Sequence, residues 1–316
     1  MAIERNLILV HQPGCQDRRD FEAIARNVSE LAPDIEAFVA SNEIPSSVTR
    51  RQASRRPTLI FSPGNLIEFR PLRGKIYAGS PIPKLEQMSR LKSAGISVPA
   101  FAEITPDIVL SEGKFASHVV VKPGFSLSSH GQDITLMRRT SVSYRSRESF
   151  PEDHPGRHGP MFVQRFVDTG LFVSHYRVLT LFGTPLLAYK NTSKIARPPL
   201  DVSDEALALI AVKARRRASM AQTQLVHEAD VLALASSTYR ALPEIPLHGV
   251  DVIREATTGE LFVLEVNPGG NTWSFSKGDT PVRLKKALGV DSLTEQFDAF
   301  TTAARVLIER TRAEAA

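Results

Sequence analysis

Cysteine and long apolar runs are nearly absent from this sequence. Cys15 is the single cysteine in 316 residues, which excludes an internal disulfide and a cysteine-based metal cluster. A lone free thiol is typical of a reducing compartment. No stretch approaches the roughly 20 apolar residues of a membrane helix, and the start, MAIERNLILVHQPG, is too charged and too briefly apolar for a signal peptide. We therefore expect a cytoplasmic protein with no membrane partner.

Nucleic-acid features are also missing. The net charge of +5 permits an anionic ligand without showing one. The basic segment SSVTRRQASRR has no interleaved aromatic residues, so we expect a surface turn there and no nucleic-acid partner.

The loop Tyr144–Gly159, rich in Arg, Pro, Gly and His, is expected to be mobile. A hydrophobic fraction of 42% in a chain of this length favours two or three subdomains.

Helical and strand patterns alternate along the chain, which predicts a mixed α and β class. Helices are predicted at Asp20–Leu31, Pro83–Gly95, Ser203–Arg217 and Gln222–Leu242, and over most of the tail from Val282 to Ala316. Strands are predicted at Leu7–Val10, Ile35–Val39, Thr58–Phe61, His118–Lys122, Ile134–Met137, Met161–Val167, Leu171–Leu181, Pro185–Lys190, Val250–Arg254 and Glu260–Val266. The first three strands and the first helix indicate a small βαβ-type domain at the N-terminus.

The most informative segment is the hairpin GVDVIREATTGELFVLEVNPGG. With its turn centred on Thr258, Asp251 and Glu265 face each other across the strands, and directly opposed like charges repel. Asn267 lies two residues further and points to the same face. Two carboxylates among apolar neighbours need a positive partner, and oxygen ligands of this kind suit Mg²⁺. The alternatives are neutralisation by Lys or Arg, or one shared proton.

The same register predicts which apolar side chains share each face of the hairpin. Ile253, Val263 and Leu261 are expected on the face of the carboxylates, and Val250, Val252, Phe262, Leu264 and Val266 on the other. A bulge would shift this register and weaken the argument.

Two further segments carry positive charge. Lys122 ends a predicted strand before the small-residue loop GFSLSSHG, which includes Ser128 and Ser129. A lysine there can reach a phosphate, and backbone N–H groups of such a loop can close over phosphate oxygens. The loop is not a Walker A loop, and an ordinary hairpin loop is the alternative. Arg177 lies inside an apolar strand, so it needs an anion: a phosphate, Glu265, or another structural ion-pair partner.

Together these segments resemble the ATP-grasp superfamily, from about Lys84 to Gly270. The strongest match, DVIREATTGELFVLEVNPGG, resembles the metal-binding hairpin of glutathione synthetases, D-alanine–D-alanine ligases and ribosomal-protein glutamate ligases. The resemblance implies an α+β fold with an N-terminal α/β domain (1–83), a small central lid (84–162) and a C-terminal lobe (163–316). It also implies ATP bound between the last two.

The resemblance assigns roles to individual positions. It implies two Mg²⁺ ions held by Asp251, Glu265 and Asn267, with Mn²⁺ able to replace them. It places Lys122 and, less securely, Lys84 on phosphates, Arg177 on the transferred phosphate, and Gly269 and Gly270 near the substrate. Adenine is expected along the nucleotide-binding segment Gln164, Arg165, Phe166, Val167 and Asp168.

Some positions depart from the family pattern. Some relatives have an acidic residue for ribose two positions before the arginine, where this chain has His175, and Asp168 is an alternative for that role. Lys190 is our choice for a further basic catalytic residue, with Lys194 and Arg197 as alternatives. The resemblance implies an ATP-dependent carboxylate–amine ligase acting through an acyl phosphate on small-molecule or peptide substrates, with a homodimer as an open expectation. A small-molecule kinase and a non-catalytic nucleotide-binding protein are the alternatives.

Overall fold

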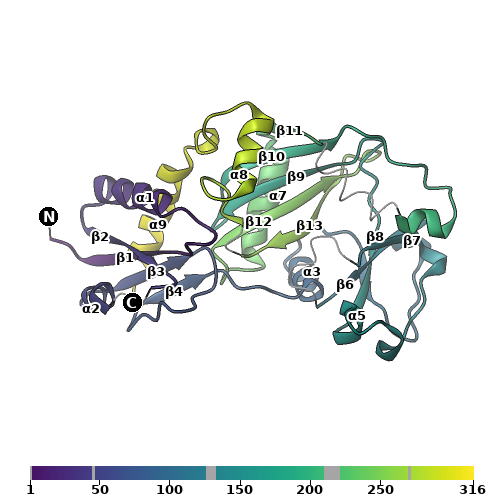
Figure 1. The fold of residues 1–316 in the computed structure, drawn as a ribbon, viewed down its shortest axis with the longest axis horizontal. Helices are drawn as coiled ribbons and strands as arrows, with labels where there is room; N and C mark the ends of the chain where they lie inside the picture. Colours follow the sequence, from purple (N-terminus) through teal and green to yellow (C-terminus); the bar gives the residue numbers. More distant parts are fainter. Residues whose placement is uncertain (1, 45–46, 126–132, 210–220, 270–271) are drawn as a thin grey trace.

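The computed structural model describes residues 2–44, 47–125, 133–209, 221–269 and 272–316. Helices and strands are mixed throughout, and the strands form three sheets that follow one another along the molecule (Figure 1). The described ends of the chain lie at the same end of the molecule, beside the N-terminal sheet. None of the helices in these ranges has the length and apolar character that crossing a membrane requires.

The N-terminal sheet is parallel, with strand order β2-β1-β3-β4. Its strands are β1 (Arg5–His11), β2 (Ile35–Ser41), β3 (Thr58–Ser62) and β4 (Lys75–Ala78). Helix α1 (Arg18–Leu31) begins after Asp17, whose side chain accepts a hydrogen bond from the Arg19 N–H. The last helix, α9 (Ala299–Glu314), packs against α1 and this sheet, so both ends of the chain contribute to one apolar core.

The lid sheet is antiparallel, with strand order β5-β8-β6-β7. Its strands are β5 (Phe101–Glu103), β6 (His118–Pro123), β7 (Thr135–Arg138) and β8 (Met161–Arg165). Helix α3 (Lys84–Ser93) precedes it, and Pro83 is its N-cap residue rather than the first-turn residue that the prediction of Pro83–Gly95 implied. Four short helical segments complete this part of the chain: α4 (Glu112–Phe115), η1 (Arg139–Ser141), η2 (Arg147–Ser149) and α5 (Pro155–His158).

The central sheet is antiparallel, with strand order β11-β10-β9-β12-β13. Its strands are β9 (Ser174–Leu181), β10 (Thr184–Ser193), β11 (Ala221–Leu225), β12 (Leu247–Arg254) and β13 (Leu261–Asn267). The associated helical segments are α7 (Ala229–Ser237), η3 (Thr238–Arg240), α8 (Asp279–Leu288) and η5 (Glu295–Phe297). Helix α7 packs against β9, β10, β12 and β13, and α3 approaches β13 (Figure 1).

Two predicted elements are wrong in type. The segment Gln222–Leu242 is not one helix, because its first residues form strand β11, paired with β10, and α7 begins only at Ala229. The alternation in AQTQL fits a half-exposed edge strand, which pairing with β10 stabilises. The basic segment expected as a turn contains helix α2 (Ser47–Ala53). Residues 204–209 of the helix predicted at Ser203–Arg217 are helical, and residues 210–217 lie outside the described ranges.

Candidate functional site

The hairpin of β12 and β13 brings the two predicted carboxylates together. Asp251 pairs with Glu265 across the strands, and Gly249 pairs with Asn267, which confirms the predicted opposition. The register then shifts, so that Val252 pairs with Val263. The extra residue on β13 is a β-bulge next to the carboxylates, a common position for bulges near functional sites.

Because of the bulge, the faces predicted for the β13 residues between the turn and Glu265 are wrong. Val263 packs in the core with Val252, away from the carboxylates. Phe262 and Leu264 pack instead with Ile253, next to Val167. One extra residue exchanges the two faces of a strand because side chains alternate.

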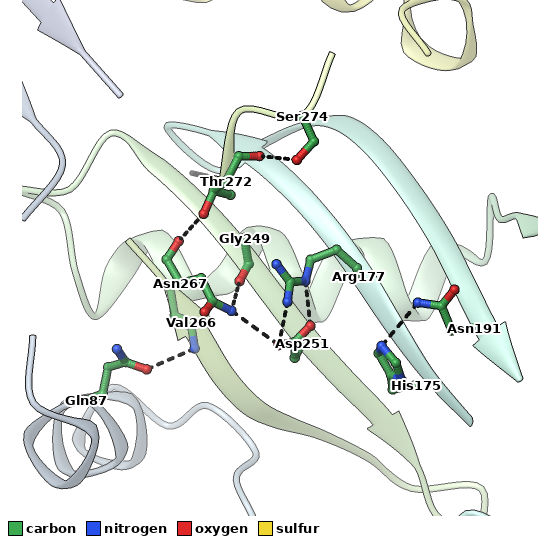
Figure 2. Close-up of polar contacts among 10 residues, drawn as sticks. All are labelled: Gln87, His175, Arg177, Asn191, Gly249, Asp251, Val266, Asn267, Thr272 and Ser274. Carbon is green, nitrogen blue, oxygen red and sulfur yellow. Dashed lines mark hydrogen bonds and ion pairs between the residues drawn. The ribbon is translucent and has the colours of Figure 1, made fainter. Parts of the chain in front are cut away.

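Arg177 lies beside the hairpin on β9, opposite Asp251 (Figure 2). Its Nε is 2.6 Å from Asp251 Oδ1 and its Nη2 is 2.9 Å from Oδ2, a bidentate pair. Burial acts to lower the pKa of Arg177, but the Asp251 carboxylate outweighs it, so that pKa lies above its ordinary value. The structural ion pair expected for Arg177 therefore exists, but its partner is Asp251 and not Glu265.

Glu265 has a lysine partner from a different element. Lys84 Nζ, at the start of α3, is 3.0 Å from Glu265 Oε1. Each carboxylate of the hairpin is thus neutralised by its own cation, which was the alternative to a metal. The two cations come from different sides, Lys84 from the helix and Arg177 from the sheet, so the space between them is bordered by both signs of charge.

Lys122 reaches the same region from the lid sheet. Its Nζ donates to Gln164 Oε1 at 2.6 Å, and Gln164 lies on the neighbouring strand β8. Burial lowers the pKa of Lys122 to about 8, even though the charges of Glu265 and Asp251 raise it. These electrostatic contacts place the lysine facing the carboxylates of the central sheet. A desolvated ammonium held by a neutral amide is suited to a phosphate ligand.

Asn267 is held so that its amide oxygen is available. Its Nδ2 donates to the Gly249 carbonyl at 3.1 Å and to Asp251 Oδ2 at 3.2 Å (Figure 2). Thr272 Oγ1 in turn donates to the Asn267 carbonyl at 3.1 Å. The Asn267 side chain therefore contributes its Oδ1 atom to the face that carries the two carboxylates.

Gly249 is required by this packing. A Cβ atom there would lie 2.4 Å from Thr272 Cγ2 and 3.3 Å from Arg177 Nη1. Because Gly249 lacks that carbon, Arg177 Nη1 and the Thr272 side chain can both lie close to the β12 backbone. Nη1 forms no hydrogen bond with the residues that the structure describes, so it remains available to a ligand.

The donor set fits Mg²⁺. Asp251, Glu265 and Asn267 offer oxygen atoms from adjacent strands, and hard divalent cations prefer oxygen ligands. No group of three or more His, Cys, Asp and Glu side chains within the described ranges could hold a metal. Two carboxylates and one amide form an incomplete shell, which phosphate oxygens would complete.

One part of the site is apolar. Val167, Ile253 and Phe262 form a small buried cluster beside the carboxylates. In the segment predicted for adenine, Arg165 N–H donates to the Ala100 carbonyl and Phe166 N–H to that of His118. The backbone N–H and carbonyl of Val167 make no hydrogen bond within the described part of the chain. The Val167 backbone is therefore available to pair with a base.

Asp168 is held by neighbours rather than facing the site freely. Its carboxylate is 2.6 Å from Arg197 Nη2 and accepts the Gly170 N–H at 2.9 Å. Arg197 is therefore an ion-pair partner of Asp168. If Asp168 contacted a ribose, its carboxylate would have to bind the ribose and Arg197 at the same time.

The structure places Lys190 on the face of the central sheet opposite to Arg177 and Asp251, so no contact with the candidate site supports the catalytic role predicted for it. Lys190 pairs with Tyr176, and its Nζ lies 4.9 Å from the centroid of that ring. The next residue along β9, Arg177, faces the opposite side of the sheet with Asp251. Lys194 is exposed on the extension of β10. Ser128, Ser129 and Gly270 lie outside the described residues, whereas the Gly269 carbonyl accepts the Thr272 N–H at 3.0 Å.

The arrangement of the strands resembles solved ligase structures. No family model and no curated protein match this chain. The ATP-grasp ligase PsnB complexed with minimal precursor is 13% identical, with 98% of this chain and 100% of that chain covered and a TM-score of 0.52. Its complex with minimal precursor, Mg and ADP is 14% identical, covers 97% and 98%, and has a TM-score of 0.51. D-alanine–D-alanine ligase from Bacillus anthracis is 12% identical, covers 97% and 99%, and has a TM-score of 0.46.

This chain has the ATP-grasp fold. The predicted α+β class is thereby confirmed. The candidate site combines five elements: α3, the lid strand β6, and β9, β12 and β13 of the central sheet.

Several polar residues around the candidate site could not be predicted from the sequence. Gln87 Oε1 accepts the Val266 N–H at 2.9 Å and so fixes the edge of β13 (Figure 2). Thr223 Oγ1 donates to Asn191 Oδ1 at 2.8 Å, and the Asn191 amide nitrogen is 3.2 Å from His175 Nε2. Burial lowers the pKa of His175, so the ring is held neutral. Their polar types alone gave no signal, because the pairing of β9, β10 and β11 brings them together.

Proposed function

We propose that this protein is an ATP-dependent carboxylate–amine ligase. A carboxylate oxygen of the substrate attacks the γ-phosphorus, the bond to the β-phosphate oxygen breaks, and ADP leaves. The amine nitrogen then attacks the acyl carbon, phosphate departs with the bonding electrons, and the amine loses a proton. The observation that carries the proposal is the row Arg177, Asp251 and Glu265 on adjacent strands, faced by Lys84 and Lys122.

The nucleotide is proposed to lie along this row. The adenine ring rests on Val167, Ile253 and Phe262, and the Val167 backbone pairs with its edge. The triphosphate extends toward Lys84 and Lys122. Two cations from different elements can hold successive phosphates in line for transfer, and such positioning is the main catalytic contribution in phosphoryl transfer.

Asp251, Glu265 and Asn267 are proposed to hold two Mg²⁺ ions, which Mn²⁺ can replace. When bound, the metal would neutralise charge on the phosphate oxygens. The residues supply the hairpin geometry, with Asn267 kept in place by Gly249 and Thr272. Binding changes the partners of both cations, because Lys84 and Arg177 neutralise the same carboxylates in the present structure.

Arg177 is proposed to stabilise the acyl phosphate. Its Nη1 atom lies toward Gly249 and Thr272, next to the segment that contains Gly269. A guanidinium placed where negative charge develops lowers the barrier, and removing one such donor typically costs about 10²- to 10³-fold in rate. The oxygen atoms of the transferring phosphoryl group and of the acyl carbon are the groups it would contact.

The substrates are proposed to be a small-molecule or peptide carboxylate and an amine. One similar structure is described as PsnB with precursor peptide PsnA2 and AMPPNP, and another as D-alanine–D-alanine ligase with ATP. Residues 1–83, 84–162 and 163–316 are our proposed N-terminal, lid and C-terminal units.

The deciding experiment traps the acyl phosphate. A panel of amino acids, small acids and peptides is incubated with ATP, Mg²⁺ and hydroxylamine, and hydroxamate and ADP are measured together. The expected result is equal formation of both, reduced about 100-fold or more in Arg177→Met. Arg197→Met, which changes an arginine paired with Asp168, is the matched control and should retain most activity.

The other two functions give different outcomes. A stable phosphate ester without hydroxamate would identify a kinase. Nucleotide binding by calorimetry without ADP formation across the whole panel would identify a non-catalytic nucleotide-binding protein. Loss of activity in both arginine variants, measured at a temperature at which both remain folded, would contradict the particular role given to Arg177.

A further inference from the structure

The lid sheet carries a cavity on the face turned away from the candidate site. It has a volume of about 370 Å³, at the small end of the range for small-molecule pockets. Val121 lines it, whereas the next residue, Lys122, faces Gln164. Consecutive residues of a strand point to opposite faces. The cavity, which we call the outer lid cavity, is therefore separated from the nucleotide region by the sheet itself.

The floor of the outer lid cavity is apolar. Val121, Met137 and Met161 come from three adjacent strands, and Ile104 follows β5. Val121 and Met137 pack against the buried core of the lid. An apolar group placed there would lose water contacts against a preformed surface, which favours its binding by about 25 cal/mol for each Å² buried.

One wall is an ordered stack of three side chains. The Arg145 guanidinium carbon lies 4.5 Å from the centroid of the Phe150 ring, and the His154 ring stacks on Phe150 at 4.6 Å with an interplanar angle of 16°. The Gly156 N–H donates to His154 Nδ1 at 2.9 Å, which fixes that ring. Arg145 Nη2 also donates to the Ser149 carbonyl at 2.9 Å. The wall is thus held in place without a ligand.

The charges that line the cavity are only partly paired. Among the described residues, Arg145 forms no ion pair with an acidic side chain and Glu103 forms none with a basic one, whereas Arg147 influences the pKa of the neighbouring Glu148. Asp133 Oδ1 lies 3.7 Å from His154 Nε2, beyond hydrogen-bond distance. A simple anion would meet two guanidinium groups but also two carboxylates. A ligand that carries both signs of charge satisfies both sets.

We propose that the outer lid cavity binds a free apolar α-amino acid. Its carboxylate is received by Arg145 and Arg147, its ammonium group by the carboxylates, and its side chain by the apolar floor. Bidentate recognition of a carboxylate is the usual role of a guanidinium. The cavity does not depend on the ligase reaction, so this site is additional to the proposed function.

A short chain of contacts connects the cavity to the phosphate lysines. The carbonyl of Pro160, which lines the cavity, accepts the Gly124 N–H at 2.8 Å, and the Gly124 carbonyl accepts the Leu85 N–H at 3.3 Å. Gly124 follows Lys122 by two residues, and Leu85 follows Lys84. A Cβ atom at Gly124 would lie 3.0 Å from the Pro160 carbonyl, so the contact is close. An occupied cavity therefore acts on the positions of both lysines.

Calorimetry with L-leucine, in the absence of nucleotide, tests the site. We expect binding by the full chain, at least tenfold weaker binding of leucinamide and N-acetyl-leucine, and at least tenfold weaker L-leucine binding in Arg147→Gln. Lys114→Gln, an exposed cation on α4 of the same lobe, should bind L-leucine normally. A leucine-terminated dipeptide with free ends should bind more weakly than L-leucine, because its ammonium group and its carboxylate lie on different residues.

Three outcomes would overturn the proposal. L-leucine, leucinamide and N-acetyl-leucine could bind equally, Arg147→Gln and Lys114→Gln could have the same effect, or none of the probes could bind at millimolar concentration. Coupling is tested by the AMP-PNP dissociation constant with and without saturating L-leucine. A change of threefold or more is expected in the wild-type chain and not in Arg147→Gln, and an unchanged constant would reject the effector role. Because leucine binding is measured alone, failure of the proposed ligase activity would leave this result intact.

Discussion

Lys84 and Glu265 form an ion pair that joins helix α3 to strand β13 at the edge of the central sheet. The Lys84 Nζ atom is 3.0 Å from Glu265 Oε1, and the lysine side chain is only 10% exposed. The same lysine is proposed to hold a phosphate, and the same carboxylate a metal ion. Both cannot keep their present partner once nucleotide and metal enter, so binding must exchange the contacts.

The first prediction follows from this exchange. Lys84→Met should increase the affinity for Mn²⁺ alone by about three- to tenfold, because the cation that competes for Glu265 is removed and such a pair is worth about 1 kcal/mol. The same variant should bind AMP-PNP more weakly. Calorimetry with Mn²⁺ in the absence of nucleotide provides the measurement.

Lys92→Met is the control for that prediction. Lys92 lies on the same helix, is exposed, and has its Nζ 5.6 Å from the Phe101 ring rather than beside a carboxylate. It should leave Mn²⁺ affinity unchanged. An unchanged Mn²⁺ affinity in Lys84→Met would show that Glu265 is not a metal ligand whose charge Lys84 masks.

The second prediction concerns the pair of Arg177 and Asp251. Arg177→Met should destabilise the fold by about 2–4 kcal/mol, because it leaves a largely buried carboxylate uncompensated. The double variant that also carries Asp251→Asn should lose less stability, because no unpaired charge remains buried. Urea unfolding curves of the wild type, both single variants and the double variant give the interaction energy.

A more exposed pair is the control here. Arg197→Met breaks the contact with Asp168, whose side chain is 41% exposed, and should cost about 1 kcal/mol or less. Additive effects of Arg177→Met and Asp251→Asn would mean that the two side chains do not stabilise each other in solution.

The sequence predicted which charged side chains lie at the candidate site, but it did not predict for every residue the face of the sheet to which its side chain points. Asp251 and Glu265 could be paired because they are equally far from Thr258 in the sequence. Next to the turn, however, Arg254 pairs with Leu261, one residue out of that register, and the bulge restores the pairing of Asp251 with Glu265. Lys122 could be placed because a strand and a small-residue loop meet there. Both inferences depend only on local spacing along the chain, and the structure brings both groups to one region.

The side-chain orientations that were predicted wrongly lie near irregularities in the strand register. The bulge before Glu265 falls within the apolar run LFVLEV, in which an extra apolar residue leaves no distinct signal. The direction of Lys190 relative to Arg177 depends on the pairing of β10 with β9, which also shifts near Pro185. A slip of one residue exchanges the faces of a strand. Strand β11 was missed because its pairing with β10, rather than its local pattern, decides its conformation.

The third prediction tests the close packing at Gly249. Gly249→Ala would place a Cβ atom 2.4 Å from Thr272 Cγ2 and 3.3 Å from Arg177 Nη1. We expect about tenfold or greater loss of ATP-dependent activity, because the guanidinium and the Asn267–Thr272 contact must both shift. Steady-state kinetics with an identified substrate, alongside melting temperatures, separates this effect from unfolding.

A second substitution can relieve the clash. Thr272→Ser removes Cγ2 and keeps the hydroxyl that donates to Asn267, so Gly249→Ala with Thr272→Ser should recover much of the lost activity. Gly113→Ala, where a Cβ atom meets nothing within 4 Å, should be neutral. Failure of the second substitution to restore any activity would contradict the steric explanation.

The last prediction concerns pH and Lys122. Burial lowers the pKa of this lysine to about 8 from its ordinary value of 10.5. Below pH 8 both the folded and unfolded chains hold the proton, whereas between pH 8 and 10.5 only the unfolded chain does. By linkage, the contribution of Lys122 to folding stability therefore rises with pH across that window.

Nucleotide binding should change in the opposite direction. A phosphate favours the charged lysine, so binding above pH 8 must take up a proton, and affinity for AMP-PNP should fall by up to about tenfold for each pH unit. Calorimetry between pH 7 and 9.5, in buffers of different ionisation enthalpy, should show proton uptake approaching one at the upper end. In Lys122→Met both the fall in affinity and this uptake should disappear, leaving weak and nearly constant binding. If the variant instead retains the wild-type slope, another group takes up the proton, because a methionine at this position cannot titrate.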